Sequence, residues 1–109
     1  MSTSFQADNP LPPRSGFVIV LDSTTVAAST TVPTTWLGCF VGVVAAAATR
    51  ILFASTSGVT ITSGVGSSAG VAVPVPAEQP QFYRLDGDDT WIHHLGSTTT
   101  TIAMWKASP

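Results

Sequence analysis

Residues 81–106, QFYRLDGDDTWIHHLGSTTTTIAMWK, carry the clearest fold signal of the sequence. Runs of β-branched and aromatic residues alternate here with two polar segments, Asp86–Asp89 and Gly96-Ser97. Asp-Gly segments are typical of turns, and a two-residue segment that begins with Gly is typical of a β-hairpin. The pattern predicts an antiparallel meander of three strands, over residues 81–85, 90–95 and 98–106.

Short apolar runs separated by turn residues continue through the rest of the chain. Val, Ile, Thr and aromatic residues dominate these runs, and such residues favour strands. Residues that favour a helix are confined to Ala45–Ala48, which is one turn at most. The expected fold is all-β: a β-sandwich or jelly-roll-like barrel of about eight short antiparallel strands. The further predicted strands cover residues 16–21, 24–28, 35–44, 50–54, 59–62 and 71–75.

The N-terminal segment differs in composition from the remainder of the chain. Pro10, Pro12 and Pro13 favour an extended backbone without a sheet partner. We therefore predict an extended N-terminal arm over residues 1–15. A length of 109 residues fits one domain, so residues 16–109 are predicted to form a single β domain.

Charged side chains are scarce. The chain has four Lys and Arg residues and six Asp and Glu residues, so 9% of it is charged, against about 25% in an ordinary soluble domain. Sixteen threonines and 12 serines supply most of the polar side chains. Four cations cannot neutralise a nucleic-acid backbone, so no nucleic-acid partner is expected. The single cysteine cannot form an internal disulfide.

A membrane-spanning helix is also disfavoured. The longest uninterrupted apolar run covers 13 residues, from Trp36 to Ala48, whereas a spanning helix needs roughly 20. A longer window would include Arg50, and a charged side chain is unfavourable at the centre of such a helix. We therefore expect no membrane partner, and a small membrane protein is a less favoured alternative.

The sequence predicts no enzyme activity and no cofactor. Gly66–Gly70 matches the G-x-S-x-G pattern with Ser68 as the central serine. That motif acts on a strand-to-helix turn of a large α/β sheet, which this chain does not predict. His93 and His94 are adjacent on a predicted strand, so their side chains diverge. We expect one of them to be packed and the other to face solvent.

Asp86, Asp88 and Asp89 form the single carboxylate cluster of the sequence. Calcium binds six to eight oxygen atoms, several of them from carboxylates, so these residues are weak candidates for a metal site. The rest of a calcium-binding loop is absent from the sequence, and Asp-Gly turns are common without a metal. A solvated turn is therefore the favoured interpretation of this segment.

Two predicted strands, residues 17–21 and residues 36–44, lack the alternation of apolar and polar residues. Successive strand residues point to opposite faces, so both faces of these strands are apolar. A two-layer sandwich buries only one face of each strand. A loop, the N-terminal arm or another subunit must cover the second face, because large uncovered apolar patches are rare on monomers.

With so few charges on the chain, we favour burial between subunits, and we expect a homo-oligomer. The segment Ser2–Arg14 is then a docking arm with Phe5 and Leu11 as its anchors, and its removal should weaken binding and leave the fold intact. The expected core or interface anchors are Phe17, Trp36, Phe40, Trp91 and Trp105.

The C-terminal region resembles small structural virion proteins of tailed bacteriophages, of the type that decorates or cements the capsid. The resemblance lies in Phe82–Leu85, the acidic turn, Thr90–His93, Leu95-Gly96 and a Thr-rich closing strand. It implies a protein of the capsid surface that is assembled in the host cytoplasm, binds the major capsid protein and stabilises the shell. It also implies a homotrimer without catalytic residues.

A carbohydrate-binding or adhesive β-sandwich module, such as a head-fibre or tail component, is the main alternative. Aromatic residues exposed in a row can stack on sugars, and three tryptophans in 109 residues are compatible with such a row. Aromatic residues are equally typical of cores and interfaces. The positions of the three tryptophans in the fold distinguish these two hypotheses.

Overall fold

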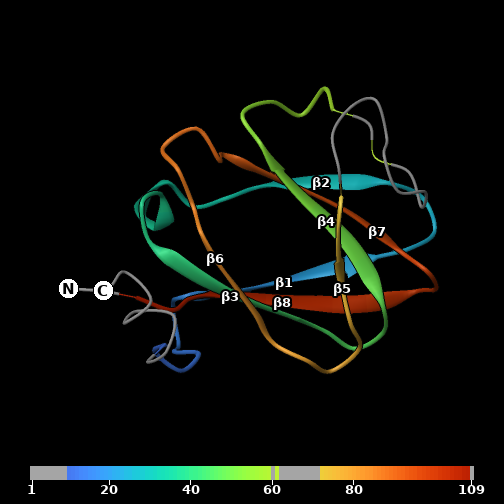
Figure 1. Ribbon diagram of the computed structural model, residues 1–109, viewed down its shortest axis with the longest axis horizontal. Coiled ribbons are helices and arrows are strands. Elements are labelled where there is room, and N and C mark those ends of the chain that lie inside the picture. The colour runs from blue at the N-terminus through green and yellow to red at the C-terminus, as the bar shows by residue number, and fades with distance from the viewer. Residues whose placement is uncertain (1–9, 60, 62–71, 109) are drawn as a thin grey trace.

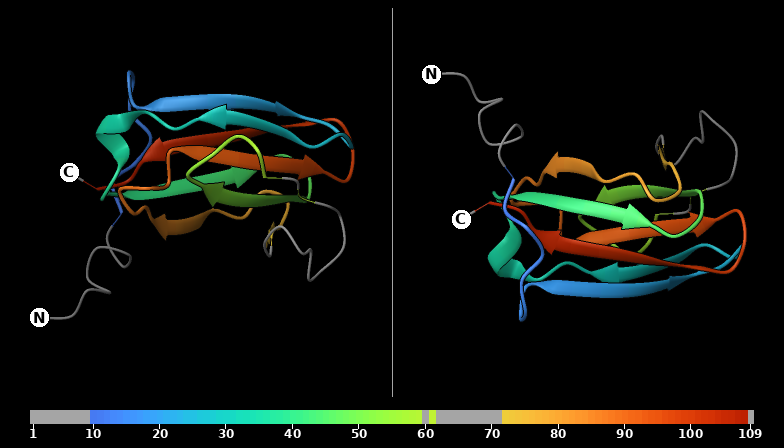
Figure 2. Two further views of the ribbon diagram at one scale, coloured as in Figure 1. Left: turned by 90° about the horizontal axis from the view of Figure 1, so that it is seen from above. Right: turned by 90° about the horizontal axis from the view of Figure 1, so that it is seen from below.

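Two four-stranded β-sheets pack face to face in the computed structural model, which describes residues 10–59, 61 and 72–108 (Figures 1 and 2). A short 3-10 helix, η1 (Thr34–Trp36), precedes the third strand. The strands are β1 (Val18–Ser23), β2 (Ala28–Thr31), β3 (Phe40–Ala45), β4 (Thr49–Ala54), β5 (Val73–Val75), β6 (Gln81–Arg84), β7 (Trp91–Gly96) and β8 (Thr100–Lys106).

The strand order is β1-β8-β3-β6 in the first sheet and β2-β7-β4-β5 in the second. Every ladder between these strands is antiparallel. Within the described ranges no ladder joins the two sheets, so the fold is an open sandwich and not a closed barrel. An eight-stranded jelly roll, made of two Greek keys, has this strand order. The prediction of an all-β sandwich is confirmed.

The predicted C-terminal meander is wrong, because β6, β7 and β8 do not pair with one another. β6 pairs with β3, β7 lies between β2 and β4, and β8 lies between β1 and β3. The turns between these strands carry the chain from one sheet to the other. Turn residues indicate where the chain reverses, whereas the partner of a strand depends on residues that are distant in the sequence.

Two N-terminal strand predictions also need correction. Residues 24–28 mostly form a turn, in which the Val26 amide donates to the Thr24 hydroxyl at 3.1 Å. The predicted strand over residues 35–44 starts late, because η1 and Gly38, with φ of 81°, interrupt the apolar run. That backbone conformation favours glycine, so the run cannot continue as one strand.

The predicted strand over residues 59–62 is not present at the residues of it that the structure describes, since neither Val59 nor Ile61 is in a strand. The Gly66–Gly70 motif with Ser68 lies outside the described residues.

The main core lies between the two sheets and follows the two-residue period of the strands. Buried side chains of β8, such as Ile102 and Met104, face Ile92 of β7 across the layers. Trp36 of η1 closes this core and is 3% exposed. The remaining members of the cluster include Leu21, Val41, Val43, Ile51, Val75 and Leu85.

Candidate functional site

The outer face of the β2-β7-β4-β5 sheet is covered by the protein's own chain. Leu95 of β7 packs with Ile61 and Ala72 in a second buried cluster, and Leu52 of β4 packs against it. The side chain of His93 also points outward from this sheet, and its Nε2 lies 2.8 Å from the Thr56 carbonyl oxygen. The described residues Thr56, Val59, Ile61 and Ala72 therefore cover this face, and we refer to them as the lid.

The outer face of the β1-β8-β3-β6 sheet is apolar across all of its strands. The register places Val18, Trp105, Gly42 and Phe82 in one row across β1, β8, β3 and β6. A second row runs from Val20 through Ala103 to Val44. Residues of the same row project from the same face of the sheet, because side chains alternate along each strand.

The N-terminal arm covers Trp105 in the first of these two rows and leaves Val18 exposed. The Leu11 amide donates to the Ala107 carbonyl oxygen at 2.7 Å, and the indole Nε1 of Trp105 donates to the Leu11 carbonyl oxygen at 2.9 Å. Trp105 is only 6% exposed. Gly42 leaves room for the indole ring, which meets Phe82 edge-on with 5.8 Å between ring centroids.

The second row stays open in the described structure. Val20 is 65% exposed and Val18 is 38% exposed, while Val44 and Ala103 are half-buried. We refer to Val18, Val20, Val44 and Ala103 as the open face. A shallow hollow continues this surface. It is lined by Val44, Ala45, Ala46, Thr101, Ala103 and the charged Glu78 of the β5–β6 connection.

The five predicted anchors lie in different environments. Trp36 belongs to the core, and Trp105 is buried under the arm. Phe40 and Trp91 are half-buried on the two outer faces. Phe17 is 43% exposed, and the Lys106 Nζ lies 5.7 Å from the centre of its ring. Since two of the three tryptophans are buried, the tryptophans do not form an exposed row for sugar stacking.

The described part of the predicted docking arm lies on its own sheet. Pro10 and Leu11 are half-buried there, whereas Pro12 and Arg14 are exposed. Phe5, the other predicted anchor, lies outside the described residues. The arm therefore provides one of the three coverings that the sequence left open for the sheet of β1 and β3. The lid after β4 covers the other sheet, which that prediction did not address.

The three aspartates of the β6–β7 connection form a turn. The Asp89 carboxylate accepts a hydrogen bond from the Asp86 amide at 2.7 Å, and the Asp89 amide donates to the Asp86 carbonyl oxygen at 3.1 Å. Across residues 10–59, 61 and 72–108, no three His, Cys, Asp or Glu side chains gather closely enough to hold a metal ion, and Asp86, Asp88 and Asp89 form no such group.

Both histidines of β7 are buried, so the prediction that one of them faces solvent is wrong. The lid covers His93, and His94 points into the sandwich, where its Nδ1 lies 3.0 Å from the Ser23 hydroxyl oxygen. Burial away from water, and secondly the charge of His93, lower the pKa of His94 below the ordinary value of 6.5. Thr49 and Thr100 add buried hydroxyl groups at this end of the sandwich, and neither has a hydrogen-bond partner among the described residues.

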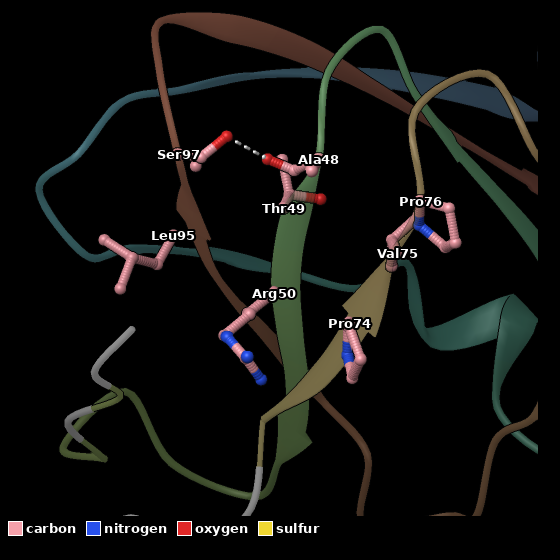
Figure 3. A pocket seen from close by; sticks show the side chains of 9 residues that line it. Ala48, Thr49, Arg50, Pro74, Val75, Pro76, Leu95 and Ser97 are labelled. Atoms are coloured by element: carbon pink, nitrogen blue, oxygen red, sulfur yellow. Dashed lines mark hydrogen bonds between the residues drawn. The ribbon is translucent and has the colours of Figure 1, made fainter. Parts of the chain in front are cut away.

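A surface pocket of about 300 Å³ lies where β4, β5 and β7 meet (Figure 3). Its wall is mostly apolar and includes Pro74, Val75 and Leu95. Arg50 is its one charged lining residue, and the Arg50 Nη1 donates to the Ala72 carbonyl oxygen at 3.4 Å. The Ser97 hydroxyl donates to the Ala48 carbonyl oxygen at 2.9 Å and closes the upper rim. A single cation without a converging polar partner indicates no particular ligand.

Comparison with protein-family models, curated proteins and solved structures gives no match for this chain. In the part of the chain that the structure describes, no helix is both long and apolar enough to cross a membrane. We take the open face as the candidate functional surface because Val18 and Val20 expose apolar side chains there. Its apolar composition could be read from the sequence, but its exposure depends on which segments cover each sheet.

Proposed function

We propose that this protein is a structural virion protein of a tailed bacteriophage, which docks on the major capsid protein through the open face and stabilises the shell. The observation that carries the proposal is the row of apolar residues from Val20 through Ala103 to Val44, which no described segment covers. The resemblance of the C-terminal region to capsid decoration proteins supplies the class of partner.

The proposed mechanism is the burial of apolar surface, with no chemical step and no cofactor. Transfer of apolar surface from water stabilises a complex by about 25 cal/mol per Å² before the entropy of association is subtracted. A single small row gives a weak contact. Many copies on one particle would bind with avidity, since each bound copy stabilises the shell locally. The small number of charges lowers the electrostatic penalty for packing copies closely.

The test is cosedimentation with empty shells assembled from the major capsid protein encoded in the same genome. The wild-type protein is expected to sediment with the shells. Val44→Lys places a charge at the β3 end of the open face and is expected to weaken binding about tenfold, which corresponds to about 1.4 kcal/mol. Thr31→Lys adds the same charge to the exposed end of β2 in the other sheet and should bind like the wild type.

Circular dichroism and thermal unfolding establish that both variants are folded before binding is compared. If Val44→Lys does not fold, Ala103→Lys tests the same row from β8. Wild-type protein that stays in the supernatant at every shell concentration would refute the proposal. A genome that encodes no capsid protein, together with saturable binding to a glycan array, would support the carbohydrate-binding alternative.

A further inference from the structure

The sandwich has four edge strands, and three of them are poorly suited to pairing with another chain. β2 and β6 have four residues each, and β5 contains Pro74, which has no amide proton to donate. β1 has six residues, VIVLDS, without proline or lysine. Sheet edges are usually kept from pairing by a short edge strand, by proline or by lysine. β1 is longer than the other edge strands and contains neither proline nor lysine.

Alternate residues of β1 present their backbone groups at the open edge. The Lys106 amide donates to the Phe17 carbonyl oxygen at 3.1 Å. Phe17 is therefore a residue whose backbone groups point toward β8, and every second residue after it along β1 does the same. In an antiparallel ladder, the residues between the hydrogen-bonded pairs point their N–H and C=O groups away from the partner strand. These residues are Val18, Val20 and Asp22.

The outward groups of these three residues have no hydrogen-bond partner within the described ranges. The side chains of the same residues project from the outer face, where Val18 and Val20 belong to the open face. An apolar strand with exposed side chains and a free ladder edge is suited to strand addition. Asp22 carries the single charge of the strand.

We propose that β1 pairs antiparallel with β1 of a second copy of this chain, around a two-fold axis at Val20. In this register Val20 faces Val20 of the second copy, Val18 faces Asp22, and Phe17 faces Ser23. Each outward N–H and C=O group of β1 then meets a partner. A register that is shifted by four residues and centred on Asp22 would place two like charges opposite each other, which is unfavourable.

The segment Phe17–Ser23 has a composition that fits this symmetry. Its apolar residues surround the centre, whereas its one acidic residue lies near one end. At the opposite end of β1, Lys106 of β8 lies over Phe17. A two-fold contact needs a surface that is complementary to itself, and this strand provides one.

Pairing would join two four-stranded sheets into one sheet of eight strands. The row from Val44 through Ala103 to Val20 would then continue into the same row of the second copy. This inference rests on the proposed function in one respect. The pairing would double the area of the open face, which is the surface proposed to dock on the capsid protein. The pairing itself requires no capsid protein, so it can be tested separately.

Sedimentation velocity of the full chain, without shells, tests the proposal over micromolar to submillimolar concentrations. The wild type is expected to form a dimer in this range. Val20→Lys places two like charges opposite each other and should raise the dimer dissociation constant at least about tenfold. Val20→Thr keeps the β-branched shape and the amide proton and should dimerise within about threefold of the wild type, and Thr31→Lys should do the same.

A cross-linking experiment tests the register. In a Cys39→Ser background, Val20→Cys should form a disulfide-linked dimer under mild oxidation, because facing residues of such a pair have Cα atoms about 5.5 Å apart. Thr101→Cys lies on the same face but on a central strand, and it should stay monomeric. If the Cys39→Ser background does not fold, the sedimentation comparison remains the test.

A wild-type chain that stays monomeric at submillimolar concentration would overturn the pairing, as would a trimer or an unchanged dimer in Val20→Lys. Failure of the proposed function has a different signature, namely a β1-paired dimer that does not bind capsid shells. Shell binding by a monomeric wild type would retain the function and refute this inference alone.

Discussion

Both outer faces of the sandwich carry apolar residues, yet these residues are covered in different ways on the two faces. On the β2-β7-β4-β5 sheet, the lid after β4 buries Leu95 and His93. On the β1-β8-β3-β6 sheet, the arm buries Trp105 and leaves Val20 and Ala103 uncovered. Apolar composition alone therefore does not mark an interaction surface. The surface left for a partner is the part of the apolar face that the chain's own segments do not reach.

The largest effect is expected where the arm meets the sheet. Trp105→Ala removes an indole that is enclosed by Gly42, Phe82 and Leu11. It should lower the free energy of unfolding by about 3–5 kcal/mol, the range for truncation of a large buried aromatic side chain. Phe17→Ala, at a 43% exposed aromatic residue, is the control and should lower it by less than about 1 kcal/mol. Equal losses in urea denaturation would show that Trp105 is not enclosed.

A lysine introduced on each of the two outer faces tests directly whether one face is covered and the other exposed. Leu95→Lys introduces a charge beneath the lid and should lower the free energy of unfolding by about 3 kcal/mol, because a buried leucine is lost and an ammonium group is buried. Val20→Lys, on the open face, should change it by less than about 0.5 kcal/mol per subunit when the protein is dilute. Chemical denaturation at submicromolar concentration measures both. Similar losses would mean that the two faces are equally covered.

Two deletions test whether the Leu11 contacts of the arm stabilise the fold. Deletion of residues 1–14 removes Leu11 and should lower the free energy of unfolding by about 2 kcal/mol, from one hydrogen bond and the exposed indole. Deletion of residues 1–9 keeps both contacts of Leu11 and should leave stability unchanged. A red shift of tryptophan fluorescence is expected in the first deletion only. A fully stable 1–14 deletion would instead agree with an arm that serves docking alone.

The smallest effect concerns pH. The pKa of His94 is lowered in the folded protein, so below about pH 6.5 the unfolded chain binds more protons than the folded one. Stability should therefore fall as the pH drops from about 7 to 5, because the unfolded chain takes up a proton that the folded chain does not. His94→Gln should show a flatter profile over the same range, whereas His93→Gln removes only the smaller of the two causes and should retain most of the slope due to His94. An identical slope in His94→Gln would remove this residue as the cause.

Local features of the fold were predictable from the sequence, whereas strand partners were not. The runs of β-branched residues predicted that the chain forms strands. The Asp-Gly segment predicted the position of the turn at Asp86–Asp89. The pairing of β8 with β1 and β3 joins residues far apart in the chain, and no local pattern encodes it. The turns that cross between the two sheets were therefore mistaken for the turns of a meander within one sheet.

The candidate surface was predictable in part. The lack of alternation in residues 17–21 correctly indicated two apolar faces on β1. Nothing in composition distinguishes Trp36, which closes the core, from Trp105, which the arm covers. Their environments follow from tertiary packing, so a list of aromatic anchors taken from the sequence mixes core residues with surface ones.

The contact between Gly42 and Trp105 has a consequence for sequence variation. Any side chain at position 42 would collide with the indole ring and lift it from the sheet. A larger residue at position 42 is therefore tolerated only with a smaller one at position 105, and the two positions should covary in natural or laboratory-evolved variants of this chain.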